Sequence, residues 1–368
     1  MNNIEKELIL EVFKYEPDEL KIKEYVTSGS INWPLVLGFV SYHRIAGLFY
    51  ERFSKINVRL LDYPVFFSTY MVNQSQKIRS ELQLDEIKKI SCVLDKNHIK
   101  HIFLKGSVLN QLIYEPGSRA SNDIDILVNK DSINKVTKIL KNIGFIQGKY
   151  NYKTNTIEPF SEDELKESII KKGETCPFVK VSNNLTIKTI DVDVNFSLDW
   201  DPNYDTNIIN TILDSRIKID IDNDSIYSAN MYYNLIELCA HFYKDMALLD
   251  IVSKRKVFDL YKVLDIYYLI KKFYKNINFT ELEKTISYTN SYDFVYFTLI
   301  NISSLFNDFE TKEITQLLKK IENRISSKNI INTIFDQYNT RIKYVTSKNI
   351  IDRFFSYNVL ELYHIDSK

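Results

Sequence analysis

The sequence predicts an α+β fold in which a small mixed β-sheet is flanked by helical regions on both sides along the chain. Three observations predict it. Apolar residues recur at helical spacing through the first hundred residues, strand-like runs follow between residues 101 and 196, and helical spacing returns from about residue 227. Because 368 residues exceed one ordinary core, we expect an N-terminal helical region (1–97), an α/β core (98–225) and a C-terminal helical domain (226–368).

Two helices are predicted in the N-terminal region. The stretch 32–53 has apolar residues at helical spacing, and Pro34 is tolerated in a first turn. A long helix over 76–99 carries an apolar stripe made by Ile78, Leu82, Ile87, Ile90 and Leu94. In the C-terminal region, 230–245 and 257–273 show the same helical spacing, and we expect helices up to the end of the chain.

The central segment alternates short strands and helices. The runs 101–104 and 123–128 predict buried strands, and 107–113 predicts a short helix between them. The run 130–145 predicts a helix that Asp131 caps and Gly144 ends.

The segment 178–196 predicts a hairpin that turns at Asn183-Asn184. The charged run 161–174, in which Ser161 and Glu164 can form a capping box, is interpreted as a solvated helix face, with an excursion over the functional site as the alternative.

Composition restricts the class of partner. The formal net charge is zero, so no overall field draws the chain to long nucleic acid or to an anionic membrane. Cys92, Cys176 and Cys239 are widely spaced and form no CxxC pair, which argues against a zinc site and favours buried free thiols in a reducing compartment. The N-terminus lacks the apolar core of a signal peptide, and no uncharged run reaches membrane-spanning length, so we expect a cytoplasmic protein.

Two carboxylates stand on one face of a predicted strand. Side chains alternate along a strand, so Asp123 and Asp125 point to one side while Ile124 and Ile126 point to the other. Unpaired carboxylates side by side repel each other when desolvated. A divalent cation relieves this repulsion, and Mg²⁺ prefers such hard oxygen ligands together with substrate phosphates.

A second acidic strand is predicted at 189–196. Asp191, Asp193 and Asn195 alternate there with apolar residues, so both aspartates face one side. If this strand lies beside 123–128, three or four carboxylates converge. That number suits two metal ions about 3.5–4 Å apart, an arrangement used in phosphoryl transfer.

The Gly106-Ser107 step precedes the acidic strand at a strand-to-helix turn. Glycine permits close approach of a ligand to the backbone, and free N–H groups at a helix start favour a phosphate. Ser107 adds a hydroxyl donor, and Lys105 and Arg119 supply positive charge for phosphate.

These residues resemble a known pattern: a Gly-Ser step, an acidic-x-acidic strand and a third acidic residue on a later strand, as in the DNA-polymerase-β-like nucleotidyltransferase superfamily. The block "LKGSVLNQLIYEPGSRASNDIDILV" (104–128) is similar to that of a bacterial family of uncharacterised nucleotidyltransferases, and the resemblance covers roughly residues 30–200. Two departures stand out: Asn195 occupies a position where many relatives have histidine, and the spacing from Gly106 to Asp123 is longer than in the tightest versions of the pattern.

The resemblance implies a Mg²⁺-dependent, ATP- or other NTP-binding nucleotidyltransferase. It implies that Asp123, Asp125 and Asp193 bind two Mg²⁺ ions, that Asp193 accepts the proton of the attacking hydroxyl, and that Gly106 and Ser107 hold the triphosphate. A phosphate role for Lys105 and Arg119 is our inference from their positions. Asp191 stays open as an alternative third carboxylate.

The expected reaction moves a nucleoside monophosphate from an NTP to an acceptor hydroxyl on a small molecule, a protein side chain or an RNA end, and releases pyrophosphate. Two alternatives remain: a non-catalytic nucleotide-binding module of the same fold, and a metal-dependent glycosyltransferase using Asp-x-Asp. The sequence leaves the acceptor and the oligomeric state open. His43 and His241 lie on apolar helical stretches and are interpreted as packing histidines.

Overall fold

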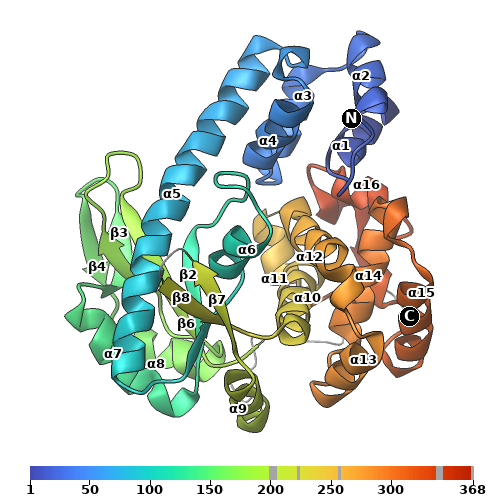
Figure 1. Cartoon of the computed structure of the whole chain (residues 1–368). Coiled ribbons are helices and arrows are strands. Elements are labelled where there is room, and N and C mark those ends of the chain that lie inside the picture. Colours follow the sequence, from blue (N-terminus) through green and yellow to red (C-terminus); the bar gives the residue numbers. More distant parts are fainter. Residues whose placement is uncertain (199–204, 222–223, 256–257, 337–342, 366–368) are drawn as a thin grey trace. The chain divides into compact units, whose positions relative to one another are not determined.

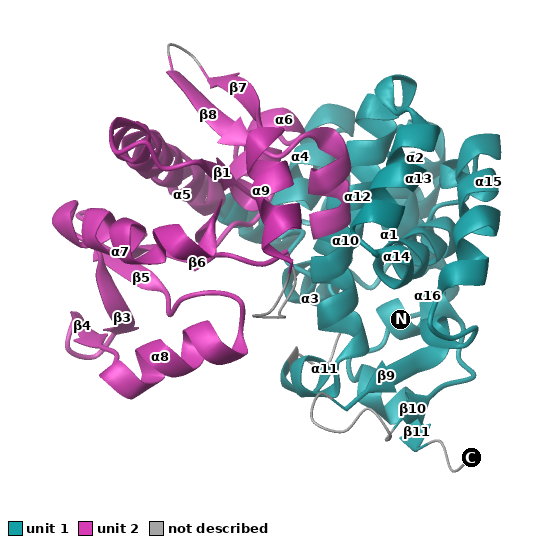
Figure 2. Cartoon of the chain, turned by 90° about the horizontal axis from the view of Figure 1, so that it is seen from below, with its two compact units in different colours: residues 1–73, 238–368 teal, residues 74–237 magenta. Residues whose placement is uncertain are grey.

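The structure is a computed structural model of the chain, and it describes all residues except 199–204, 222–223, 256–257, 337–342 and 366–368. Contacts divide the chain into two compact units (Figure 2): residues 1–73 with 238–368 form unit 1, and residues 74–237 form unit 2. One of these units combines two separate stretches of the chain, whereas the three predicted domains are consecutive. The predicted domain boundaries remain a prediction.

Unit 2 contains a mixed β-sheet, as predicted. Its strand order is β4-β3-β5-β6-β2-β1-β8-β7. The pairs β2–β6 and β1–β8 are parallel and the other pairs are antiparallel, so the α+β fold class is confirmed. The strands are β1 (His101–Phe103), β2 (Asp123–Val128), β3 (Ile146–Asn151), β4 (Thr156–Pro159), β5 (Phe178–Val181), β6 (Thr189–Asn195), β7 (Ile217–Ile221) and β8 (Asp224–Ser228).

Helices cover both faces of this sheet. The helices with residues in unit 2 are α5 (Tyr63–Lys96), α6 (Gly106–Leu112), α7 (Ile133–Asn142), α8 (Glu162–Lys171), α9 (Thr206–Asp214) and the start of α10 (Met231–Ala247). The end of α5 and α7 pack with one apolar cluster that includes Ile90, Val136 and Ile126. A second cluster, which includes Leu127 and Ile212 of α9, lies on the opposite face.

The alternation within β2 decides where the aspartates lie. Ile124 and Ile126 are fully buried in the cluster under α5 and α7. Because successive side chains in a strand point to opposite faces, Asp123 and Asp125 face the other side, together with Leu127 of the α9 cluster. Burial of the apolar side chains on one face of β2 therefore determines that the aspartates lie on the other face.

Unit 1 is mainly helical (Figure 1). Besides the first residues of α5 and the end of α10, its helices are α1 (Asn3–Val12), α2 (Glu19–Thr27), α3 (Trp33–Tyr42), α4 (Ala46–Ile56), α11 (Leu249–Arg255), α12 (Leu260–Phe273), α13 (Phe279–Tyr288), α14 (Tyr292–Leu305), α15 (Lys312–Ile321) and α16 (Ile350–Phe354). The prediction of helices to the end of the chain is wrong in one respect: β9 (Thr333–Phe335), β10 (Lys343–Val345) and β11 (His364–Ile365) form a small antiparallel sheet.

Several local predictions are confirmed. Ser161 and Glu164 form the capping box of α8, and Gly144 follows α7 with a φ of +97°. The predicted antiparallel pairing of 178–181 with 189–195 is observed. The connection spans residues 182–188, however, where the Asn184 side chain accepts hydrogen bonds from the N–H groups of Thr186 and Ile187.

Other local predictions are wrong. The predicted helix over 32–53 is two helices, α3 and α4, because the chain turns at Arg44, whose φ is +59°. Asp131 does not cap α7: a 3-10 turn comes first, and the Asn129 side chain accepts a hydrogen bond from the Asp131 N–H. Cys176 and Cys239 are buried free thiols as expected, whereas the free Cys92 is exposed. Among the described helices, none has the length and apolar character needed to cross a membrane.

Candidate active site

The parallel pairing of β2 and β6 brings the two acidic strands together. In this register Asp125 lies beside Asp193, and Asp123 lies beside Asp191. The intervening residues Ile124 and Val192 are fully buried in the core. The acidic residues of both strands therefore share one face of the sheet, as the alternation in the sequence predicts.

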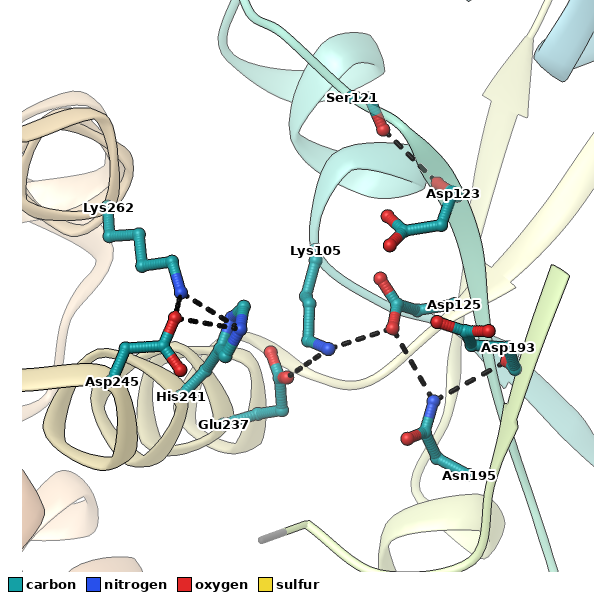
Figure 3. A network of polar contacts seen from close by, with 10 residues as sticks. All are labelled: Lys105, Ser121, Asp123, Asp125, Asp193, Asn195, Glu237, His241, Asp245 and Lys262. Carbon is teal, nitrogen blue, oxygen red and sulfur yellow. Dashed lines mark hydrogen bonds and ion pairs between the residues drawn. The ribbon is translucent and has the colours of Figure 1, made fainter. Parts of the chain in front are cut away.

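Asp123, Asp125 and Asp193 gather at this face (Figure 3). Burial raises the pKa of Asp193 well above its usual range, and the neighbouring charges of Asp123 and Asp125 raise it further. Asp125 is itself 4% exposed. Water therefore screens the repulsion between these carboxylates poorly, and a nearby positive charge would stabilise their ionised forms.

Asp191 has different electrostatic neighbours. Burial raises the pKa of Asp191, while a hydrogen bond with Thr189 and the charge of Arg79 on α5 act in the opposite direction. The charges that act on Asp193 are instead those of Asp123, Asp125, Glu174 and Lys105. The charges around the two residues thus favour Asp193 as the third member of the cluster.

Lys105 supplies a positive charge at the cluster. Its Nζ lies 2.8 Å from Asp125 Oδ1 and 3.9 Å from Glu237 Oε1. Burial alone would lower the pKa of Lys105, but the charges of Asp125 and Glu237 outweigh burial and raise it. The structure therefore places Lys105 against a predicted metal ligand.

Gly106 and Ser107 begin α6 at the end of β1, as predicted. A Cβ at Gly106 would lie 2.3 Å from Ser121 Oγ and 2.5 Å from Arg119 Nη1, so no larger residue fits without displacing them. The buried Ser107 hydroxyl has no hydrogen-bond partner within the described residues. A buried hydroxyl of this kind can donate a hydrogen bond to an oxygen of a ligand.

Arg119 lies in the loop between α6 and β2 and packs against Gly106. The guanidinium is largely buried, and its Nη1 donates to the Ala120 carbonyl at 3.2 Å. In the same loop, Ser121 Oγ donates to the Asp123 carbonyl at 3.2 Å. This loop therefore connects the Gly106 step directly to the first aspartate.

Glu237, Asn195 and Glu174 are also part of the site but were not predicted to be functional. Asn195 Nδ2 lies 3.5 Å from Asp125 Oδ1. Glu174 pairs with Asn195 across an isolated bridge, so the end of the charged segment 161–174 does reach the site while most of α8 is exposed. Glu237 lies on the mainly apolar stretch of α10 and is buried. A glutamate among apolar residues of a predicted helix is the sequence feature that could have indicated a functional role, because glutamate is rarely buried without a partner.

The two histidines interpreted as packing residues differ. His43 is almost fully buried, and its Nδ1 accepts a hydrogen bond from the Leu260 N–H. In unit 1, His241 Nε2 lies 3.1 Å from Lys262 Nζ, which also pairs with the buried Asp245 (Figure 3). His241 is therefore held by polar contacts and not by apolar packing alone.

The donor set at the acidic cluster consists of hard carboxylate oxygens, which suits Mg²⁺. Within the described residues, however, no group of three or more histidine, cysteine, aspartate or glutamate side chains is gathered closely enough to hold a metal ion as it stands. At Asp125 the Lys105 ammonium provides the countercharge instead. The residue types fit the metal, and the side chains would have to converge to bind it.

A mixed sheet with Asp-x-Asp on one strand and a third aspartate beside it on a parallel strand, preceded by a Gly-Ser step, defines a nucleotidyltransferase-like protein. The chain belongs to a family described as uncharacterised nucleotidyltransferase, whose model matches residues 29–307. Comparison with curated proteins finds no match.

Among solved structures, the chain is similar to an antigenic nucleotidyltransferase-like protein from Paracoccidioides brasiliensis. The two are 16% identical, and the similarity covers 64% of this chain and 93% of the other, with a TM-score of 0.34. At that score the likeness supports no argument about this chain.

Proposed function

We propose that this chain is a divalent-cation-dependent nucleotidyltransferase that transfers a nucleoside monophosphate from an NTP to an acceptor hydroxyl. The acceptor oxygen forms a bond to the α-phosphorus, the bond from that phosphorus to the bridging oxygen breaks, and pyrophosphate leaves. One observation supports this most strongly. Asp125 on β2 lies beside Asp193 on the neighbouring parallel strand β6, and Asp123 is on the same face of the sheet.

The chain's residues suit defined roles in this reaction. Asp123, Asp125 and Asp193 would hold Mg²⁺, which when bound neutralises phosphate charge and orients the triphosphate. In this proposal Asp193 would also accept the hydroxyl proton. The Ser107 hydroxyl, which has no hydrogen-bond partner among the described residues, and the close approach allowed at Gly106 suit a phosphate oxygen. The buried Arg119 beside Gly106 adds positive charge there.

The acceptor classes remain the three that the sequence left open. The zero net charge argues against long nucleic acid and leaves small molecules, protein side chains and RNA ends. Self-modification of a hydroxyl side chain is included among the protein acceptors and would appear without any added acceptor.

The test is incubation of the full chain with each of the four α-labelled NTPs and Mg²⁺, followed by measurement of pyrophosphate release and of label transfer to the chain or to added acceptors. We expect Asp123→Asn and Asp125→Asn to lower the rate by roughly 100-fold or more. Asp191→Asn is the matched control, because Asp191 lies on the same strand face but interacts with Thr189 and Arg79.

Three outcomes would contradict the proposal. Full activity in the Asp123→Asn, Asp125→Asn double variant would exclude the acidic cluster as the catalytic centre. NTP binding without turnover would favour the non-catalytic module, and preference for a nucleoside-diphosphate sugar in a titration would favour a glycosyltransferase.

A further inference from the structure

We propose that the Lys105 ammonium is the resident countercharge of the acidic site, and that Glu237 is the positioning residue that receives it when a divalent cation binds Asp125. Lys105 and the cation would thus compete for one carboxylate. This inference rests on the proposed function, because it assumes that Asp125 is a cation ligand.

The first observation is the position of the ammonium between two buried carboxylates (Figure 3). Lys105 Nζ lies 2.8 Å from Asp125 Oδ1 and 3.9 Å from Glu237 Oε1. The Asp125 and Glu237 side chains are 5% and 3% exposed, whereas that of Lys105 is 19% exposed. In so little solvent the attraction between these charges is screened less than at the surface, which favours an ammonium held at the site.

The second observation is the backbone of Lys105. Its φ is +49° and its ψ is −123°, a conformation that favours glycine and costs a residue with a side chain energy. The turn is fixed by hydrogen bonds from the Val108 and Leu109 N–H groups to the Lys105 carbonyl. A lysine kept in a strained turn, where glycine would fit without strain, indicates that its side chain serves the site.

The third observation is the alternative partner. A divalent cation bound to Asp125 Oδ1 would repel an ammonium on the same oxygen. Glu237 is already within 3.9 Å of Lys105 Nζ, so a small rotation of the flexible lysine side chain keeps the ammonium paired and buried. Without a second acceptor the ammonium would be left unpaired, which is costly in a buried site.

The experiment measures Mn²⁺ binding to the full chain by electron paramagnetic resonance, without nucleotide. If Lys105 competes with the cation, Lys105→Met binds Mn²⁺ about tenfold more tightly than the wild type. Its melting temperature is lower than that of the wild type in metal-free buffer, and saturating Mn²⁺ reduces the difference.

The matched control is Lys180→Met, because Lys180 pairs with Glu86 at 3.0 Å in the same unit and, among the described residues, forms no ion pair with Asp123, Asp125 or Asp193. Lys180→Met is expected to lower the melting temperature and to leave Mn²⁺ affinity unchanged. This control separates loss of a buried ion pair from competition at the site.

Glu237 is tested through a double-mutant cycle. Glu237→Gln removes the second acceptor and is expected to weaken Mn²⁺ binding about threefold in the wild type. In the Lys105→Met background the same change is expected to have no effect, because Glu237 acts through Lys105. A merely structural role would give the same effect in both backgrounds.

The inference is overturned if wild type binds Mn²⁺ and Lys105→Met binds it no more tightly, while the proposed function stands. If Mn²⁺ binds to neither protein, the cation dependence of the proposed function falls, and the inference falls with it. If the affinities follow the expected order but no NTP is turned over, the inference stands and the proposed activity fails.

Discussion

The substitution Gly106→Ala is expected to lower both stability and activity, because the added Cβ would collide with Ser121 and Arg119. The added Cβ would lie 2.3 Å from Ser121 Oγ, 2.5 Å from Arg119 Nη1 and 2.9 Å from Ser121 Cβ, all too close for real contacts. Arg119 Nη1 ends a flexible side chain and can withdraw. Ser121 Cβ is attached directly to the loop backbone, so the loop before β2 has to shift.

The magnitude follows from two opposing effects. Overpacking a closed site costs about 1–3 kcal/mol, and replacing glycine by alanine in a helix returns about 0.5–1 kcal/mol. The expected net loss in the free energy of unfolding is therefore about 0–2.5 kcal/mol. Because Ser121 Oγ donates to the Asp123 carbonyl, the shift reaches a proposed metal ligand, and a displacement near 1 Å is expected to lower the rate by about 100-fold.

The assay combines urea unfolding with the labelled-NTP assay. Gly38→Ala in α3 is the matched control: nothing lies within 4 Å of its Cβ, so we expect a gain of about 0.5–1 kcal/mol and unchanged turnover. Adding Ser121→Gly to Gly106→Ala should restore stability but not rate, since the bond to Asp123 is lost. A Gly106→Ala protein as stable and active as wild type would refute the reasoning.

Three further predictions follow from single residues. Burial lowers the pKa of His43 to about 3 from an ordinary 6.5, so the unfolded chain binds a proton that the folded chain excludes; the free energy of unfolding should fall by about 2 kcal/mol from pH 7 to pH 5, and urea titrations of His43→Gln should show a weaker pH dependence. Ser107→Ala removes a hydroxyl without a partner in the described structure, so stability should be unchanged or rise by up to about 1 kcal/mol, whereas KM for NTP rises; a lower melting temperature would contradict this. Asn195→Asp places a fourth carboxyl 3.5 Å from Asp125 Oδ1 and should cost about 1–3 kcal/mol at pH 7.5; the loss should shrink when Mg²⁺ is added, and a loss that Mg²⁺ does not change would count against a cation at Asp125.

Much of the fold around the acidic strands could be predicted because it is determined by local alternation. The bounds of β2 and the capping box of α8 both follow from adjacent residues. The strands β3, β4 and β7, of which β4 and β7 lie at the two edges of the sheet, were not predicted, since their exposed positions carry no regular apolar pattern. The break at Arg44 was hidden because a residue other than glycine adopts the positive φ there.

In the candidate site, too, local features could be predicted from the sequence and the features set by strand pairing could not. Alternation within the sequence places Asp123, Asp125, Asp191 and Asp193 on one face if their strands are adjacent, but it does not show that the strands are adjacent or in which register. A shift of the pairing by one residue would turn the acidic side chains of one strand into the core. Register is set by apolar residues on both strands, which bury the opposite face.

The choice between Asp191 and Asp193 depends on residues far away in the sequence. Both aspartates lie on one strand face, so their own positions cannot distinguish them. Asp191 is influenced by Arg79, which is carried by a helix that precedes the sheet, whereas Asp193 is influenced by Asp123, Asp125 and Lys105. Arg79 offsets part of the effect of burial on the pKa of Asp191, whereas at Asp193 the two neighbouring carboxylates add to the effect of burial and Lys105 opposes them. The choice of Asp193 as the proposed third ligand therefore depends on charges that the tertiary structure brings together, and not on the acidic motif alone.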